Sequence, residues 1–379
     1  MSLEQRIRAP GKKKILALDG GGILGMISVE ILSALEDMLR KKTNAGPNFV
    51  LSDYFDFVAG TSTGAIIAAC IASGMSVARI REFYLTSGND MFDPACILNR
   101  LHYKYDDDNL SLKLKEELGE ETTLGDPKLK SMLMMVMRNA TTDSPWPVSN
   151  NPFAKYNLQT RRDEPHCDCN LDLPLWKLVR ASTAAPTFFP PEVVAVGRKT
   201  FIFVDGGVTM YNNPAFQAFL MATSEPYHVQ WETGEDKMLV VSIGTGVNPE
   251  ANDKLKTAQM HVGYELKTII PALTYAAKNE QDFLCRTFGA CKIGLPLDRE
   301  VGDMIGKTGP TKSKLFTYMR YDADVTQAGL NKLGLEDIQA KHVQALDSVE
   351  HVDKLQRLGA VVAANQIKAE HFAGFLEYH

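Results

Sequence analysis

A Gly-Thr-Ser-Thr-Gly motif at residues 60–64 constrains the fold of this chain more than any other feature. It follows an apolar, strand-like run over residues 54–59 and precedes a helix-like run of small residues over 65–72. In that setting G-x-S-x-G forms a sharp strand-to-helix turn that presents the serine at a helix N-terminus. Glycines suit such a turn because flanking backbones come close there. The motif therefore predicts that Ser62 is a nucleophile.

A second glycine-rich stretch lies one strand earlier in the chain. Residues 15–18 form an apolar run of the kind found in buried parallel strands. Residues 19–25, Asp-Gly-Gly-Gly-Ile-Leu-Gly, follow directly, and apolar residues then recur at helical spacing over 27–39. The order strand, glycine loop, helix, strand predicts a βαβ unit and a parallel sheet.

The glycine loop has two chemical interpretations. Gly20, Gly22 and Gly25 match the spacing of the dinucleotide-binding fingerprint. In that fold an acidic residue at the end of the next strand holds the ribose, whereas here the next strand leads into Ser62. The other interpretation is an oxyanion hole, in which N–H groups of the loop, with no side chains in the way, stabilise a tetrahedral intermediate. The serine motif favours the oxyanion hole, and a nucleotide-binding module stays as the alternative.

A serine nucleophile needs a base. The chain has eight histidines, at positions 102, 166, 228, 261, 342, 351, 371 and 379. None stands at a clear strand end with a following loop, where α/β-hydrolases place theirs. Asp205 follows the apolar run 201–204, at a strand's C-terminal end, where open α/β sheets place site residues. A carboxylate in a dry pocket becomes more basic, so we predict a Ser62–Asp205 dyad.

Composition and charge argue against several classes of function. The net charge of −5 supplies no basic field for a nucleic acid polymer. Six scattered cysteines and a charged first segment without a secretory signal predict reduced thiols and a cytoplasmic location. The cluster at residues 166–169, His-Cys-Asp-Cys, lacks the second ligand pair of a structural zinc site. We therefore expect no metal and no cofactor.

The remaining sequence predicts further helices, strands and loops. The uncharged stretch 57–78 is long enough to span a bilayer, but its glycines, hydroxyl residues and alanines predict a buried strand, turn and helix instead. We expect helices over 76–85, 111–118, 175–184, 255–288 (interrupted at Pro271) and 348–365. Strands are expected over 129–137, 201–204 and 238–243, with a strand pair in 314–321, a loop over 139–172, and a cap or surface loop over 86–109.

Six motifs in this order resemble those of the patatin-like phospholipases: residues 19–25, 60–64, 181–190, 205–207, 212–214 and 242–246. The resemblance runs from about residue 15 to 246, and more loosely through the tail. It implies serine acyl hydrolysis of lipid esters by a Ser–Asp dyad. By position, Ser62 matches the nucleophile, Asp205 the base, and Gly20, Gly21 and Gly22 the oxyanion loop. The remaining motif glycines are Gly25, Gly60, Gly64, Gly206 and Gly207.

The resemblance also implies the fold class. We expect an α/β fold, a three-layer α/β/α arrangement with a mostly parallel central sheet, similar to patatin. Residues 13–365 are expected to form a single catalytic domain, with core motifs over 15–246 and a mainly helical C-terminal layer over 247–379. Residues 1–12 are an N-terminal extension.

The expected activity is a lipid acyl hydrolase of the phospholipase A type. Its partners would be membrane phospholipids or other acyl lipids, bound peripherally. The candidate contacts are Phe188, Phe189 and residues 269–275, and for each of them a place in the core is the alternative. Many family members carry a basic residue where this chain has Leu24, a difference that bears on phospholipid preference. Some bacterial relatives are activated by cyclic dinucleotides in phage defence. A phospholipase with such a small-molecule activator therefore stays as an alternative.

Overall fold

A nine-stranded sheet forms the centre of the described part of the protein, a computed structural model in which residues 1–92, 109–158, 168–186, 188–248 and 262–377 are described. The strand order is β5-β6-β3-β2-β1-β7-β9-β8, and β4 pairs with β3. The strands are β1 (Lys13–Leu18), β2 (Phe57–Thr61), β3 (Met132–Asn139), β4 (Ser144–Ser149), β5 (Glu192–Val196), β6 (Lys199–Asp205), β7 (Met238–Ile243), β8 (Ala290–Ile293) and β9 (Thr317–Tyr321).

The central part of the sheet is parallel. β1 pairs in parallel with β2 and β7, β2 with β3, and β9 with β7 and β8. Antiparallel pairing is confined to the other end, where β4 and β6 pair with β3 and β5 pairs with β6. Every residue of β1 and β7 is buried, because helices cover both faces of a parallel sheet.

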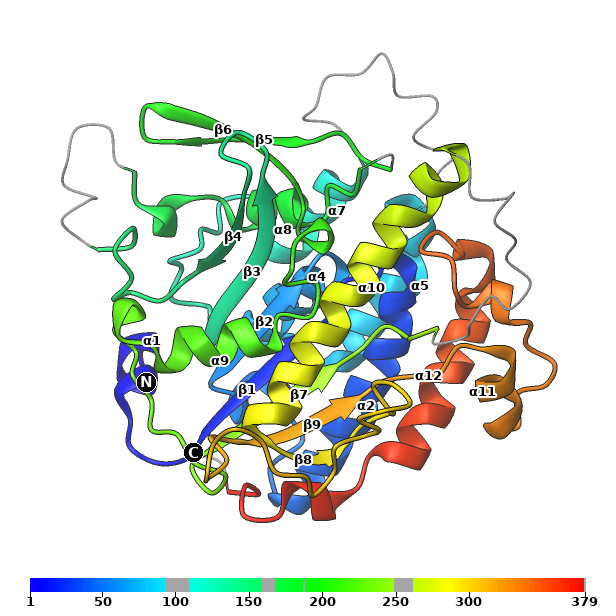
Figure 1. Ribbon diagram of the computed structural model, residues 1–379. Helices are drawn as coiled ribbons and strands as arrows, with labels where there is room; N and C mark the ends of the chain where they lie inside the picture. Colours follow the sequence, from blue (N-terminus) through cyan, green and yellow to red (C-terminus); the bar gives the residue numbers. More distant parts are fainter. Residues whose placement is uncertain (93–108, 159–167, 187, 249–261, 378–379) are drawn as a thin grey trace.

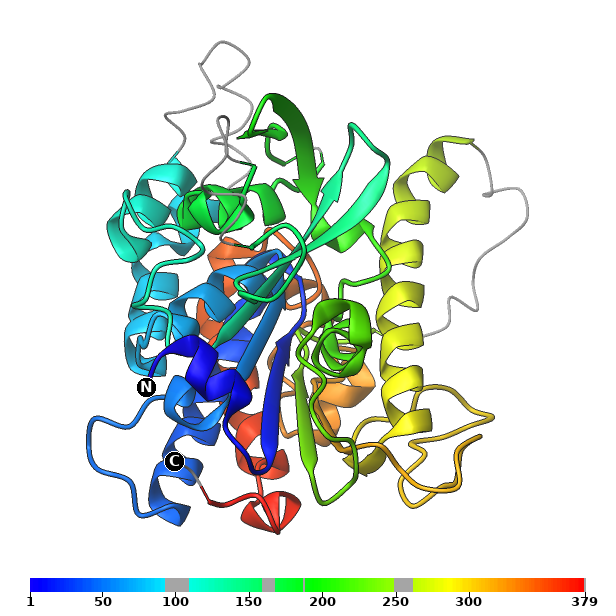
Figure 2. The ribbon, with the colours of Figure 1, turned by 90° about the vertical axis from the view of Figure 1, so that its left-hand side faces the viewer.

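Helices form a layer on each face (Figures 1 and 2). One face carries α2 (Gly25–Lys42), α4 (Thr63–Ala72), α5 (Val77–Phe92), α7 (Asn109–Leu118), α8 (Leu175–Ser182) and α12 (Val352–Gln366). The other carries α9 (Ala215–Thr223) and α10 (Val262–Phe288). Shorter helices are α1 (Leu3–Arg8), α3 (Leu51–Tyr54) and α11 (Gln327–Lys332). The three-layer α/β/α fold with a mostly parallel sheet is therefore confirmed.

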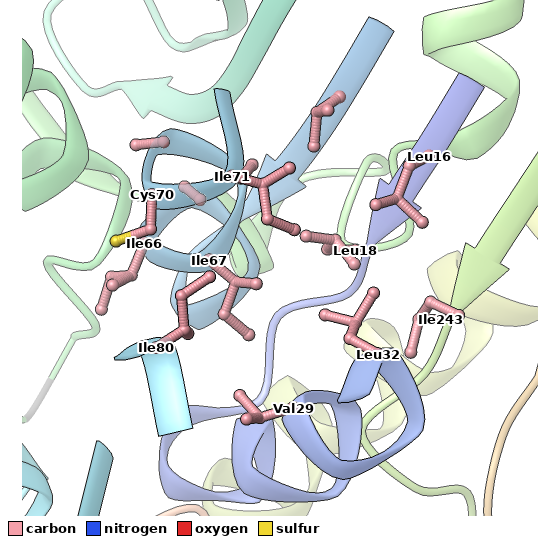
Figure 3. Packing of buried hydrophobic residues seen from close by; sticks show 14 of the residues in the cluster. Leu16, Leu18, Val29, Leu32, Ile66, Ile67, Cys70, Ile71, Ile80 and Ile243 are labelled. Carbon is pink, nitrogen blue, oxygen red and sulfur yellow. The ribbon is translucent and has the colours of Figure 1, made fainter. Parts of the chain in front are cut away.

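Alternating side chains along the strands pack into two separate hydrophobic cores. Leu16 and Leu18 of β1 pack with α2 and α4, whereas Ile15 and Ala17 pack with α9. This follows from the period of two along a strand. In Figure 3, Leu32 of α2 points toward Leu18 and toward the neighbouring strand β7.

Several predicted elements are confirmed, and others need correction. The strand over 238–243 has the predicted bounds. The strand predicted over 54–59 is wrong at its start, because Tyr54 ends the short helix α3 and β2 begins at Phe57. The hydroxyl of Tyr54 donates to the carbonyl of Phe375, at the other end of the chain. Such a long-range contact leaves no local sequence signal.

The predicted loop over 139–172 contains the strand β4, and β5 was not predicted at all. Pro145 and Pro147 lie within β4 and suggested a loop. A proline is tolerated in a strand whose N–H side is not needed for pairing, and β4 pairs only with β3 in the described part of the chain. The strand pair predicted over 314–321 is a single strand, β9, whose partner β8 lies earlier in the chain.

The helix predicted over 255–288 is not interrupted, because α10 continues through Pro271. A proline removes one backbone hydrogen bond from a helix, and burial of Lys278 and Cys285 holds the second half in place. The C-terminal region also supplies β8 and β9 to the sheet, so it is more than a helical layer. The predicted single domain over 13–365 stays a prediction.

The N-terminal extension is attached to the rest of the fold. Arg6 of α1 donates to the carbonyls of Ser52 and Phe55, at 2.5 and 3.0 Å. Among the helices of the described ranges, none has both the length and the apolar character required to cross a bilayer.

We expect Leu32→Ala to lower the free energy of unfolding by about 3 kcal/mol, because it leaves a cavity in the core between α2 and the sheet. Urea denaturation followed by circular dichroism measures the loss. Leu112→Ala is the matched control, since Leu112 of α7 is 45% exposed and should lose little. Equal losses in the two variants would contradict this packing.

Candidate active site

Ser62 makes the turn between β2 and α4 by itself. Its backbone angles are φ 55° and ψ −125°, a conformation that costs a non-glycine residue about 1–3 kcal/mol. The turn brings the backbones on both sides into close contact. A side chain on Gly60 would overlap the Gly64 carbonyl, and one on Gly64 would overlap the carbonyl of Leu18 in β1. The two glycines are therefore required by space.

Ser62 and Asp205 meet because two strands approach each other along one edge of β3. Thr61, the last residue of β2, lies opposite Val136. Asp205, the last residue of β6, lies opposite Met137. β4 pairs with the same stretch of β3 from the other edge. β2 and β6 therefore share an edge and meet head-on, which places Ser62 and Asp205 side by side.

The two side chains are joined by a short hydrogen bond. Ser62 Oγ donates to Asp205 Oδ2 at 2.6 Å, and the Gly207 N–H donates to Asp205 Oδ1 at 2.6 Å. Burial raises the pKa of Asp205 from its ordinary value of 3.8 to about 6, although the bonds from Ser62 and Gly207 and the charge of Arg180 lower it. Asp205 is thus a stronger base than an exposed aspartate.

The backbone of Ser62 is held by a residue to which the sequence pattern assigned no role. The Ser62 N–H donates to Ser182 Oγ at 3.0 Å, and that hydroxyl donates to the carbonyl of Val136 at 2.5 Å. Ser182 ends α8, within the 181–190 motif. Thr61 Oγ1 also donates to the carbonyl of Tyr211 at 2.7 Å. Thr61 and Ser62 are therefore both hydrogen-bonded to neighbouring segments.

The glycine loop lies directly against the dyad. A Cβ on Gly20 would be 3.2 Å from the Cβ of Ser62. A Cβ on Gly25 would be 2.5 Å from the hydroxyl of Thr63, at the start of α4. Gly206 is equally confined, because a side chain there would overlap the carbonyl of Val136. Glycine at these positions lets three backbone segments converge around Ser62.

Two N–H groups of the loop remain for a ligand. The Gly20 N–H donates to the carbonyl of Asn212 at 3.1 Å, and the Ile23 N–H donates to a carbonyl of the C-terminal region at 3.0 Å. Between them, the N–H groups of Gly21 and Gly22 have no protein acceptor within the described ranges, and both residues are partly exposed. Both N–H groups are therefore available to a ligand that binds at the loop.

The surroundings of the loop do not favour nucleotide binding. β2 ends at Thr61 and leads into Ser62, so no acidic side chain stands at its end to hold a ribose. The carboxylate of Asp19 is already bound by Arg320, at 2.6 and 2.8 Å. Leu24 is buried and packs in the hydrophobic core.

None of the described histidines is hydrogen-bonded to Ser62 or Asp205. His371 contacts the hydroxyl of Tyr321, and the rings of His342 and His351 lie 4.1 Å apart, tilted by 54°, beside Lys354. No group of three or more histidine, cysteine or acidic side chains in the described ranges could hold a metal ion. His166 and Cys167 lie outside the described residues, as does most of the predicted cap over 86–109.

The chain is similar in sequence to a protein family and to known proteins. The family model described as "Patatin-like phospholipase" matches residues 16–219. The 85/88 kDa calcium-independent phospholipase A2 of Mus musculus is 32% identical over 251 residues, which cover 62% of this chain and 27% of that protein. Patatin-17 of Solanum cardiophyllum is 30% identical over 262 residues, covering 65% of this chain and 63% of the patatin. The chain thus spans less than two thirds of either relative's length.

Among solved structures, VipD from Legionella pneumophila matches 92% of this chain and 67% of its own, with 14% identity and a TM-score of 0.38.

We expect Asp205→Asn to raise the free energy of unfolding at pH 8 by about 3 kcal/mol, because the ionised carboxylate is buried at a cost. The raised pKa means that this cost is full above about pH 6. It shrinks as the pH falls from about 6 toward 3.8, and it disappears below that value, where the group is neutral whether the chain is folded or unfolded. Urea denaturation at pH 8, 6 and 4.5 measures the trend.

Asp236→Asn is the control, since Asp236 is exposed. A gain in stability that did not shrink with falling pH would contradict the buried charge as its cause.

Proposed function

Because the chain belongs to the patatin-like phospholipase family, we propose that it is a lipid acyl hydrolase of the phospholipase A type that works through a Ser62–Asp205 dyad. The observation that supports this most directly is the 2.6 Å hydrogen bond between Ser62 Oγ and Asp205 Oδ2 at a strained strand-to-helix turn. A serine bonded to a base of raised pKa is the arrangement that nucleophilic catalysis requires.

In the first half-reaction, Ser62 Oγ attacks the carbonyl carbon of the ester while its proton passes to Asp205 Oδ2. The carbonyl oxygen becomes an oxyanion and accepts hydrogen bonds from the Gly21 and Gly22 N–H groups. Each such donor is worth about 3 kcal/mol in the transition state. The N-terminus of α4 adds a favourable field. The C–O bond to the alcohol then breaks, the alcohol takes the proton from Asp205, and an acyl-enzyme remains.

In the second half-reaction, Asp205 takes a proton from water and the resulting hydroxide attacks the acyl carbonyl. The same two N–H groups stabilise the second oxyanion. The bond to Ser62 Oγ breaks, the serine oxygen regains its proton from Asp205, and the fatty acid leaves. No step of this scheme calls on a metal ion or a cofactor.

We further propose that the substrates are phospholipids or other acyl lipids taken from a membrane surface. Ile269 and Leu273, one helical turn apart on α10, are 52% and 63% exposed. Thr274 Oγ1 donates to the carbonyl of Gly207 at 3.3 Å, so this part of α10 lies beside the turn that follows Asp205. The two apolar side chains suit a peripheral contact with lipid. Phe189 suits it less, because it packs against the core.

The extent and location of the enzyme are proposed on the same basis. A single catalytic domain over 13–365 is supported by β8, β9 and α12, which share the sheet and the helical layer of the matched region. Cys70, Cys285 and Cys291 are buried thiols, which suits a reducing compartment such as the cytoplasm. Neither nucleotide binding nor activation by a cyclic dinucleotide is favoured by the family match.

We expect Ser62→Ala and Asp205→Asn each to reduce fatty-acid release from phosphatidylcholine vesicles by at least about a thousandfold, because each removes one partner of the dyad. Release is measured by mass spectrometry with purified protein. Ser73→Ala, at the far end of α4, and Asp236→Asn are matched controls that should keep normal activity. Fatty-acid release by a folded Ser62→Ala variant at the wild-type rate would rule out the mechanism.

We also expect kcat/KM on a short, soluble p-nitrophenyl ester to fall about tenfold per pH unit below pH 6. Asp205 accepts the Ser62 proton only when ionised, and its pKa is raised to about 6. The rate should level off above that value. Circular dichroism at each pH controls for unfolding. A rate that stays level down to pH 4.5 in folded protein would show that Asp205 is not the base.

A further inference from the structure

The glycine loop is held by a residue that lies beyond the family match. Thr245 follows β7 and is buried, and its Oγ1 donates to the carbonyl of Gly20 at 2.9 Å. The sequence places Thr245 in the 242–246 motif but gives it no task. Residues 16–219, which the family model covers, do not include it.

Because of the geometry of one peptide group, this contact also fixes the direction of the Gly21 N–H. The Gly20 carbonyl and the Gly21 N–H belong to the same planar trans peptide, so they point in opposite directions. A donor that fixes the carbonyl on one side therefore fixes the direction of the N–H on the other. The next peptide is fixed in the same way, because the Gly21 carbonyl accepts from the Leu24 N–H at 3.1 Å.

We propose that Thr245 is a positioning residue that aims the Gly21 N–H at the oxyanion, an inference that rests on the hydrolase activity proposed above. Gly21 is the loop residue closest to it. A Cβ on Gly21 would meet the Cβ of Thr245 at 2.6 Å and its hydroxyl closer still. The side chain of Thr245 thus supports the loop from the side opposite the oxyanion.

Lys278 of α10 orients the hydroxyl of Thr245. Its Nζ lies 3.5 Å from Thr245 Oγ1 and 3.3 Å from the carbonyl of Gly246. An ammonium group can only donate. The hydroxyl oxygen must therefore accept from Lys278, which leaves its own proton to point at Gly20.

The guanidinium of Arg320 links the two segments that are joined by the hydrogen bond between Thr245 and Gly20. Arg320 of β9 binds Asp19, the residue before Gly20, and also Asp322, each at 2.6 Å. Asp322 in turn accepts from the Gly246 N–H at 2.8 Å, directly after Thr245. The buried ion pairs fix the distance between the loop and Thr245 on both sides of the hydrogen bond. Thr245 can therefore act as a rigid support.

The test compares Thr245→Val with Thr245→Ser on the soluble p-nitrophenyl ester. Valine keeps the shape of threonine but removes the donor, whereas serine keeps the hydroxyl. We expect kcat to fall about tenfold or more in Thr245→Val with little change in KM, because the contact acts in the transition state. Thr245→Ser should restore most of the rate. Thr317→Val is the matched control, since Thr317 is a buried threonine of β9 whose hydroxyl donates to the carbonyl of Glu235.

A second measurement separates positioning from general damage to the fold. A trifluoromethyl ketone with a short alkyl chain forms a reversible adduct in which Ser62 Oγ bonds to the ketone carbon and Asp205 takes the serine proton. The ketone oxygen becomes an oxyanion, so affinity for the inhibitor should fall in Thr245→Val by about the same factor as kcat. Should Thr245→Val fail to fold, Thr245→Ala removes the same donor with less bulk.

The outcomes separate the inference from the proposed function. Wild-type kinetics and inhibitor affinity in a folded Thr245→Val variant would overturn the positioning role and leave the dyad intact. Equal losses in Thr245→Val and Thr317→Val would also overturn it, because they would reflect general destabilisation. A wild-type protein that does not hydrolyse the ester would contradict the proposed function, and the inference with it.

Discussion

The reversal of the chain at Ser62 is the constraint on which the rest of the site depends. A strand becomes a helix across a single residue with φ of 55°. This is possible only where the backbones of Gly60, Gly64 and Leu18 touch without side chains between them. β1 must therefore run beside β2, and the loop that follows β1 must lie next to Ser62. The βαβ order and the position of the glycine loop are two consequences of one steric requirement.

The geometry of the site lowers the stability of the folded protein, and packing around the site offsets this loss. The backbone of Ser62 is strained, and the carboxylate of Asp205 is buried where its charge is poorly solvated. The burial of α4 offsets the strain at Ser62 and the buried charge of Asp205. Every residue of α4 is buried in the core between the sheet and the helical layer, and most of these residues are apolar. Ser182 also accepts the Ser62 N–H. The low solvation that destabilises the Asp205 carboxylate also raises its pKa, so this cost cannot be removed without making the carboxylate less basic.

The sequence predicts those features that depend on neighbouring residues. Ser62 and Asp205 stand out because each closely follows an apolar run and has glycines nearby in the sequence, and β7 is found because five of its six residues are apolar. β4 was missed because its prolines imitate a loop. The contacts of Ser182 and Arg320 leave no local pattern. Arg320 lies 301 residues from Asp19, and a buried arginine in a strand gives no sign of which carboxylate it binds.

These long-range contacts connect the C-terminal part of the chain to the glycine loop. The family match ends at residue 219 and the motifs end at 246, yet Asp19 is paired with Arg320 of β9 and approached by Lys278 of α10. A buried carboxylate that loses its partner costs about 3–5 kcal/mol. Without residues 278–322, that charge would stand uncompensated directly before the glycine loop. Residues of the C-terminal third therefore support the glycine loop, which is held by β9 through Arg320 as well as by β1, the strand that precedes it.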